Sequence, residues 1–255
     1  MFRPCIDLHE GKVKQIVGSS LAGNGSSPQT NFVSEYPSTW YAELYKRDRL
    51  TGGHIVMLGP GNEESARAAL RAYPGGLQIG GGINADNARS FLDEGASQII
   101  VTSWVFREGQ LDWERLQRLV NAIGRKRLVL DLSCRQRDGQ YFVMTDRWQK
   151  FTELTISAET LETLAKSCAE FLVHAVDVEG LCKGVDLDLV EKLGHWSPIP
   201  TTYAGGARSL RDLEEVTRLT QGKIDLTIGS ALDIFGGAGV RYSDAVAFNR
   251  SQGNR

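Results

Sequence analysis

Short apolar runs alternate along the chain with longer stretches in which apolar residues recur every three or four positions. The runs are often β-branched, as buried parallel strands are, and they lie at 5–8, 54–58, 77–80, 98–102, 128–132, 171–176, 201–204 and 225–228. Helical periodicity predicts helices at 62–70, 85–94, 113–123, 158–169, 187–193 and 210–219. Strands that alternate with helices favour a parallel sheet with helices packed outside it.

Eight such units in 255 residues match the usual size of a TIM barrel. A doubly wound sheet is the alternative, but that fold usually has fewer strands and carries its phosphate loop after the first one. We therefore predict a single-domain α/β protein, a TIM (β/α)8 barrel over residues 1–242. Residues 243–255 are polar and are expected to form a frayed tail.

An internal repeat supports the barrel. Asp7 ends the first predicted strand and Asp131 the fifth, 124 positions later; Gly82 follows the third strand and Gly206 the seventh, again 124 positions later. Ser103 and Ser230, each after the next strand, extend the correspondence with a small offset. The pattern predicts a two-fold half-barrel repeat, with halves at about 1–125 and 126–242.

Two segments depart from the plain alternation. Residues 18–38 are rich in Gly, Ser, Asn and Pro and are long for a connection, which is typical of a functional lid. Residues 134–150 contain Asp138-Gly139 between alternating residues, which predicts a hairpin turn.

Composition narrows the class of protein. A net charge of −2 argues against nucleic acid or an anionic membrane as the main partner. The four cysteines form no zinc-type cluster and are expected to be free thiols in a reducing compartment. The first strand begins almost at once, so we expect no signal peptide and a cytoplasmic location. We also expect the protein to be a monomer.

The two glycine loops are the first candidates for chemistry. Gly81, Gly82, Gly205 and Gly206 lack a Cβ, so their backbone can approach a ligand closely. A helix that begins directly after each loop would add N–H groups suited to phosphate, and Ser103, Gly229 and Ser230 would complete the sites. A glycine pair can also simply turn a strand into a helix. Because two such loops match, we favour phosphate binding and expect a substrate with a phosphate at each end.

Asp7 and Asp131 are the second candidates. Each stands at the C-terminal end of a strand, on the face of a TIM barrel that carries the active site. Burial among apolar neighbours is expected to raise the pKa of a carboxyl, which suits acid–base work near neutral pH. A structural aspartate is the alternative for either residue alone; the symmetric pair favours catalysis.

Three further residues are weaker candidates for the active site. His174, inside the sixth predicted strand, is either a core histidine or a proton partner at the barrel mouth. Asp177 is placed at the end of that strand and is expected to bind substrate. Trp148 beyond the hairpin either packs in the loop or stacks on a planar ring of the substrate. The chain has no Ser-His-Asp order, no HExxH and no dinucleotide fingerprint, so no cofactor and no metal is implied.

Together these motifs resemble the ProFAR isomerase family of histidine biosynthesis, often called HisA. The resemblance is carried by CIDLHEGKV from Cys5, QIGGGI from Gln78, VLD to Asp131, YAGG from Tyr203 and IGS to Ser230. It covers about residues 3–237, and TNFVS from Thr30, VTSW from Val101 and LDIFGG from Leu232 bring it closest to the eukaryotic-type branch.

The resemblance implies a cofactor-free barrel that carries out an Amadori rearrangement, aminoaldose to aminoketose, on a substrate with two phosphoribosyl groups. It implies that Asp7 is the general base at C2′ and that Asp131 is the general acid at the ring oxygen. Gly81, Gly82 and Ser103 would hold one phosphate, and Gly205, Gly206, Gly229 and Ser230 the other. Bacterial members usually carry Thr after the sixth strand; here the sequence reads His174-Ala175-Val176, so either His174 replaces that Thr or the two aspartates act alone.

Two other functions remain as alternatives. The related cyclase of imidazole glycerol phosphate synthesis usually has Lys eight residues after its first Asp, whereas Gln15 stands here. A non-catalytic sensor of phosphoribosyl ligands would need the glycine loops but neither Asp7 nor Asp131. Side activity on phosphoribosylanthranilate is left open.

Overall fold

The computed structural model describes residues 1–17, 29–146 and 148–253. Its strands are β1 (Phe2–Arg3), β2 (Cys5–His9), β3 (Lys12–Ile16), β4 (Thr30–Val33), β5 (Gly53–Met57), β6 (Leu77–Gly80), β7 (Ile99–Val101), β8 (Phe106–Arg107), β9 (Gln110–Leu111), β10 (Leu128–Asp131), β11 (Cys134–Arg137), β12 (Gln140–Thr145), β13 (Lys150–Thr155), β14 (Glu170–His174), β15 (Thr201–Ala204) and β16 (Ile224–Thr227). Its α-helices are α1 (Ser38–Arg47), α2 (Glu63–Ala72), α3 (Ala88–Asp93), α4 (Trp113–Ile123), α5 (Ala158–Leu164), α6 (Leu187–Trp196), α7 (Leu210–Leu219) and α8 (Tyr242–Ser251).

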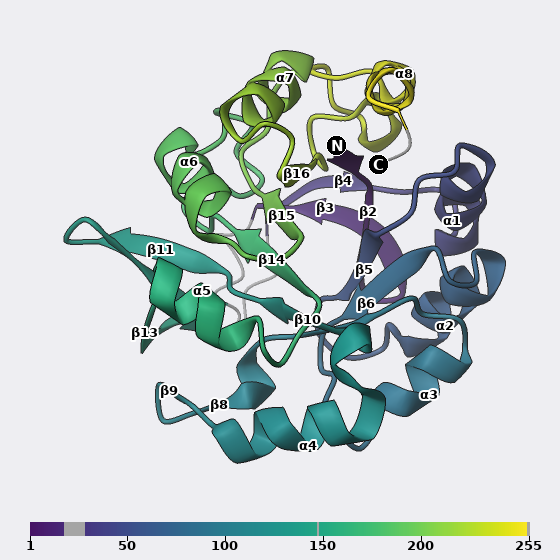
Figure 1. The fold of residues 1–255 in the computed structure, drawn as a ribbon. Helices are drawn as coiled ribbons and strands as arrows, with labels where there is room; N and C mark the ends of the chain where they lie inside the picture. Colours follow the sequence, from purple (N-terminus) through teal and green to yellow (C-terminus); the bar gives the residue numbers. More distant parts are fainter. Residues whose placement is uncertain (18–28, 147, 254–255) are drawn as a thin grey trace.

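Eight parallel strands close into a barrel, with helices around them (Figure 1). β1 and β2 act as one strand interrupted at Pro4, because β1 pairs with β16 on one side and β2 pairs with β5 on the other. The order around the barrel is then β2, β5, β6, β7, β10, β14, β15 and β16. The predicted TIM barrel is confirmed, and β2 and β10 lie four strands apart, on opposite sides.

The outer helices form where amphipathic periodicity and end signals coincide. In α4, Leu116, Leu119 and Ile123 are buried on one face, and the side chain of Asp112 accepts a hydrogen bond from the Arg115 amide at 3.0 Å. Gly124 ends the helix with a φ of +79°. Sequence signals of this kind explain why the predicted helices are found, with shifts of a few residues at their ends.

The hairpin is confirmed, and the structure adds a strand to it. Asp138 and Gly139 have φ values of +52° and +78°, which suit the tight turn between β11 and β12. β13 pairs with β12 to complete a three-stranded antiparallel sheet. Of the expected lid, β4 pairs with β3, whereas positions 18–28 lie outside the described residues.

The expectation of a frayed C-terminal tail is wrong. Residues 242–251 form α8, in which Ala245 and Val246 are buried. The Asn249 side chain holds the main chain of Phe2, since its Oδ1 accepts from the Phe2 amide at 2.7 Å and its Nδ2 donates to the Phe2 carbonyl at 2.8 Å. α8 and β1, from opposite halves of the sequence, therefore lie together (Figure 1), and α8 covers the strand that closes the barrel.

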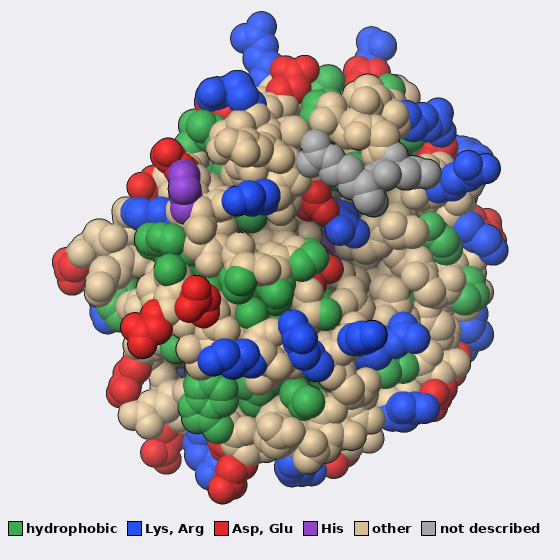
Figure 2. Space-filling model, viewed as in Figure 1, with side chains coloured by type: hydrophobic (Ala, Val, Ile, Leu, Met, Phe, Trp, Pro, Cys, Tyr) green, Lys and Arg blue, Asp and Glu red, His purple; other side chains and the backbone are tan. Residues whose placement is uncertain are grey.

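Surface charge is mixed on the face seen in Figure 2, where Lys and Arg side chains alternate with Asp and Glu around the rim. This distribution matches the small net charge of the chain. Among the described residues, no helix has both the length and the apolar character needed to cross a bilayer.

A buried polar network at the start of the strands gives a stability prediction. Glu170, 6% exposed, accepts hydrogen bonds from Gln78 Nε2 at 2.8 Å and from Thr202 Oγ1 at 2.9 Å. In Glu170→Ala both donors lose this acceptor inside the barrel, so we expect unfolding to become easier by about 2–4 kcal/mol. Urea denaturation followed by circular dichroism measures it. The exposed Glu162→Ala is the control, with an expected change within about 0.5 kcal/mol; equal losses in both variants would contradict the role of the network.

Candidate active site

A cavity of about 1140 Å³ opens at the C-terminal ends of the barrel strands. Its lining includes every residue predicted from the sequence as catalytic or phosphate-binding, and also Trp148. The fold therefore brings together side chains that lie more than 200 positions apart, at the end of a TIM barrel where active sites form.

Asp7 lies near the end of β2, where the strand reaches the cavity. Its Oδ2 accepts a hydrogen bond from Gln15 Nε2 at 3.0 Å. Burial, together with the nearby carboxylate of Glu179, raises the pKa of Asp7 to about 7, although His174 and the Gln15 hydrogen bond act in the opposite direction. The carboxylate is thus a stronger base than an ordinary aspartate, as the sequence predicted.

Asp131 ends β10 on the opposite side, surrounded by hydrogen-bond donors. Its Oδ1 accepts from the Ser133 amide at 2.9 Å and from Ser133 Oγ at 2.7 Å, while Oδ2 accepts from Thr102 Oγ1 at 3.0 Å. His174 Nδ1 lies 3.5 Å from Oδ1. Asp131 and His174 thus form a carboxylate–imidazole pair.

The expectation that burial raises the pKa of Asp131 is wrong. Burial acts in that direction, but the charge of His174 and the hydrogen bonds from His174, Ser133 and Thr102 outweigh it and lower the pKa. Burial would conversely lower the pKa of His174, yet Asp131, Glu179 and Asp7 raise it to about 9. At neutral pH the pair is therefore a carboxylate and an imidazolium, and its proton resides on His174.

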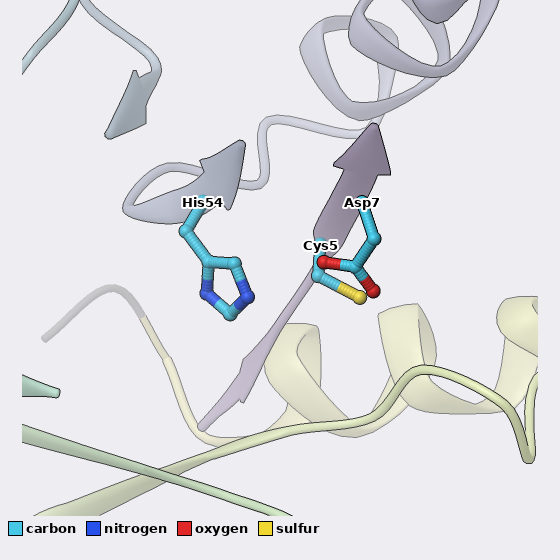
Figure 3. A group of neighbouring side chains, drawn as sticks. All are labelled: Cys5, Asp7 and His54. Carbon is cyan, nitrogen blue, oxygen red and sulfur yellow. The ribbon is translucent and has the colours of Figure 1, made fainter. Parts of the chain in front are cut away.

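Beneath Asp7, two more side chains point into the same space. Cys5 and Asp7 project from β2 and His54 from the neighbouring β5 (Figure 3), and their potential ligand atoms all lie within 4.8 Å of one another. These are residue types that bind transition metals. However, Gln15 Nε2 directs its N–H groups at both Asp7 Oδ2 and Cys5 Sγ, the latter at 3.9 Å, and a donor in that place opposes a cation. The residues therefore fit a metal poorly.

The two glycine loops have matching backbones. Gly81 and Gly205 have φ values of +96° and +117°, and Gly82 and Gly206 have +68° and +76°. A Cβ at Gly81 would stand 2.2 Å from the Met57 carbonyl oxygen. Only glycine therefore suits these turns, and the half-barrel repeat extends to the conformation of the backbone.

The predicted start of the second helix at 210 is confirmed, whereas α3 starts three residues later than predicted, so neither helix begins directly after its glycine loop. α3 starts at Ala88 and α7 at Leu210. The candidate hydrogen-bond donors for a phosphate are instead the backbone amides of the glycine loops and the hydroxyls of Ser103 and Ser230, which also line the cavity.

The assignment for Asp177 does not agree with the structure. β14 ends at His174, and Asp177 lies in the following turn, 58% exposed, with Oδ1 3.2 Å from Arg135 Nε. Glu179 lines the cavity in its place. Its Oε2 is buried and has no hydrogen-bond partner among the described residues, and burial raises its pKa.

Trp148 lies at the cavity with its ring centroid 5.8 Å from that of His174, inclined at 42°. Stacking on substrate stays a prediction. Sequence reasoning missed Gln15, His54 and Glu179 as site residues. Gln15 stands at the position where the related cyclase usually has Lys, and this comparison could have marked it. His54 lies on β5, which carries no predicted site residue, and Glu179 lies in a turn that no periodicity marks.

Comparison with known proteins shows the family of the chain. The sequence model of a family described as "Histidine biosynthesis protein" matches residues 1–238. The chain is 54% identical to a chloroplastic protein of Medicago truncatula, over 98% of the chain and 82% of that protein. It is 51% identical to a protein of Neurospora crassa, over 98% and 99% respectively, and 49% identical to one of Saccharomyces cerevisiae, over 99% of both.

All three relatives carry the name 1-(5-phosphoribosyl)-5-((5-phosphoribosylamino)methylideneamino)imidazole-4-carboxamide isomerase. The Medicago protein is named as chloroplastic, so the cytoplasmic location expected for this chain stays a prediction.

Proposed function

This chain belongs to the histidine biosynthesis protein family and is an isomerase, and on that premise we propose that it converts ProFAR to its aminoketose by an Amadori rearrangement. The observation that carries the proposal is the placement of Asp7 and of the Asp131–His174 pair on opposite sides of one cavity, between two matched glycine loops. A substrate with a phosphoribosyl group at each end would span that cavity.

Ring opening needs a proton at the ring oxygen. We infer that the Asp131–His174 pair supplies it, because a histidine whose pKa lies at about 9 is charged at neutral pH. Asp131, whose own pKa is lowered, then orients the imidazolium and holds its charge. This refines the role that the family resemblance gives to Asp131: the carboxylate governs the proton that His174 carries.

The second step removes a proton from C2′ of the opened sugar. Asp7 is placed for that task from the opposite strand, and a base works best when its pKa lies near the working pH. Its pKa of about 7 meets that condition. The proton passes to the carboxylate oxygen, the electrons stay on the substrate, and reprotonation gives the ketose without any redox partner.

Glu179 and Trp148 complete the proposal. Glu179 lines the cavity, and its Oε2, which has no partner in the part of the chain that the structure describes, would accept a hydrogen bond from a substrate hydroxyl. Trp148 would stack on the imidazole carboxamide ring. Both contacts position the substrate rather than move protons.

The test is direct. Purified protein is mixed with ProFAR, conversion is followed by absorbance with the next pathway enzyme as the coupling reagent, and the product is identified by mass spectrometry. Turnover to the aminoketose is expected. Cyclase activity on that ketose with ammonia would favour the cyclase alternative, and tight binding without turnover would favour the sensor.

A further inference from the structure

Gln15 on β3 connects the candidate base to one phosphate loop. The side chain is 3% exposed. Its Nε2 donates to Asp7 Oδ2 at 3.0 Å, and its Oε1 accepts from Ser230 Oγ at 3.2 Å. A single amide therefore touches the group that would take a proton and the hydroxyl that would hold a phosphate.

The orientation of that amide follows from the charge of Asp7. An ionised carboxylate only accepts hydrogen bonds, so the NH2 group must face it and the carbonyl must face Ser230. The single hydroxyl proton of Ser230 is then directed to Gln15. A phosphate oxygen also only accepts, so in this state Ser230 has no proton left for it.

Protonation of Asp7 reverses this preference. The carboxylic acid now carries a donor, which the Gln15 carbonyl can accept after the amide rotates by half a turn. The NH2 group then faces Ser230 and donates to Oγ, beside the weaker 3.5 Å contact from Asn31 Nδ2. The hydroxyl proton of Ser230 becomes free to point at the phosphate.

We propose that Gln15 is a positioning residue whose amide rotates when Asp7 takes the proton from the substrate, so that Ser230 strengthens its hold on the phosphate only as the reaction proceeds. The inference rests on the proposed function. An interaction that forms after the ground state lowers the barrier instead of merely tightening binding. Through Gln15, the protonation of Asp7 is thus coupled to phosphate binding at one of the two loops.

Among the described residues, the other phosphate loop has no such connection to a catalytic group. The matching hydroxyl, Ser103 Oγ, accepts a hydrogen bond from the Asp146 amide at 3.1 Å, so its proton is free to reach a phosphate in every state of Asp7. We therefore expect the two serines to differ in kinetics although the half-barrels repeat. Ser103 contributes uniform binding, and Ser230 contributes binding that develops during the reaction.

Other titratable groups also face Asp7, and the test must separate them from Gln15. They are Cys5 on the same strand, His54 on β5, His174 on β14 and Glu179 in the turn that follows it. All of them remain in a Gln15 variant. Any effect that disappears with Gln15 alone is therefore due to the amide.

The experiment is a double-mutant cycle on kcat and KM for ProFAR. Ser230→Ala is expected to lower kcat by about tenfold, whereas Ser103→Ala raises KM and leaves kcat within about twofold. In a Gln15→Met background, which keeps the unbranched length, Ser230→Ala should change KM instead of kcat, while the effect of Ser103→Ala stays as it was. An equal kcat loss from Ser230→Ala in both backgrounds overturns the proposal.

A binding measurement does not depend on turnover and separates this inference from the proposed function. Sulfate, which stays fully ionised, is titrated calorimetrically into wild type, Gln15→Met and Ser230→Ala one pH unit above and below the pKa of Asp7. In wild type, affinity should fall with rising pH about tenfold more than in either variant, because only wild type frees the Ser230 proton when Asp7 is protonated. The same pH dependence in all three proteins would overturn the inference even if the enzyme isomerises ProFAR.

Discussion

Asp7→Asn is expected to lower kcat for ProFAR by about 10²–10⁴-fold, the usual contribution of a positioned general base. Asparagine keeps the shape of the side chain but accepts no proton at any accessible pH. Affinity for a substrate analogue should not fall, because both glycine loops are unchanged and a neutral side chain at position 7 leaves Ser230 free for the phosphate. The coupled absorbance assay gives kcat, and calorimetry gives the affinity.

The same variant should be more stable than wild type. The pKa of Asp7 is raised on folding, to about 7 from an ordinary value of 3.8, so the ionised carboxylate destabilises the fold wherever the unfolded chain would be charged, above about pH 4. Asparagine removes that cost, and we expect a higher urea midpoint at pH 8.

Asp93→Asn is the control for both measurements, because Asp93 is 66% exposed and, among the described residues, its ion pair is with Arg89 on the same helix. It should change neither kcat nor the urea midpoint appreciably. If Asp7→Asn kept more than a tenth of wild-type kcat, Asp7 would not be the base.

The barrel could be predicted because its signals are local. Most positions of the core strands are buried, and short buried runs leave a pattern in the sequence, so the predicted bounds of Leu77–Gly80 and Thr201–Ala204 agree with the structure to the residue. The glycine pairs were found for a similar reason, since positive φ and close packing leave no other residue type. The repeat then placed Asp7 opposite Asp131.

The sequence predictions are wrong where contacts between distant parts of the chain determine the structure. Between Phe171 and Val178 most residues are apolar and several are β-branched, and they continue past the end of β14. The pattern alone therefore places Asp177 in the cavity and gives no sign of Glu179. The pKa of Asp131 depends on Thr102 and His174, which come from other strands. α8 was read as a tail because its hydrophobic face is short, although the main chain of Phe2, more than 240 positions away, anchors it.

The Asp131–His174 pair leads to the second large effect. Asp7 must be ionised to act as a base, so kcat/KM should fall as the pH drops below about 7. His174 must be charged to act as an acid, so kcat/KM should also fall as the pH rises above about 9. The wild-type profile is therefore expected to be a bell between these two values.

Asp131→Asn should remove this window. Burial alone lowers the pKa of His174, and Asp131 is the main group that raises it. Without that carboxylate the imidazole is expected to lose most of its charge at pH 7, where Asp7 is only half ionised. The charged acid and the charged base would then hardly coexist, and we expect kcat/KM to fall by about 10²–10⁴-fold at every pH.

His174→Gln distinguishes this mechanism from one in which Asp131 itself is the acid. Glutamine can still donate a hydrogen bond to Asp131 but carries no transferable proton, so the variant should be slow and should lack the alkaline limb near pH 9. His195→Gln, a change at an exposed histidine on α6, should keep the full bell. If His174→Gln retained the alkaline limb and near-normal kcat, the proton would have to come from Asp131. That carboxyl would then have to be protonated although the hydrogen-bond donors around it lower its pKa.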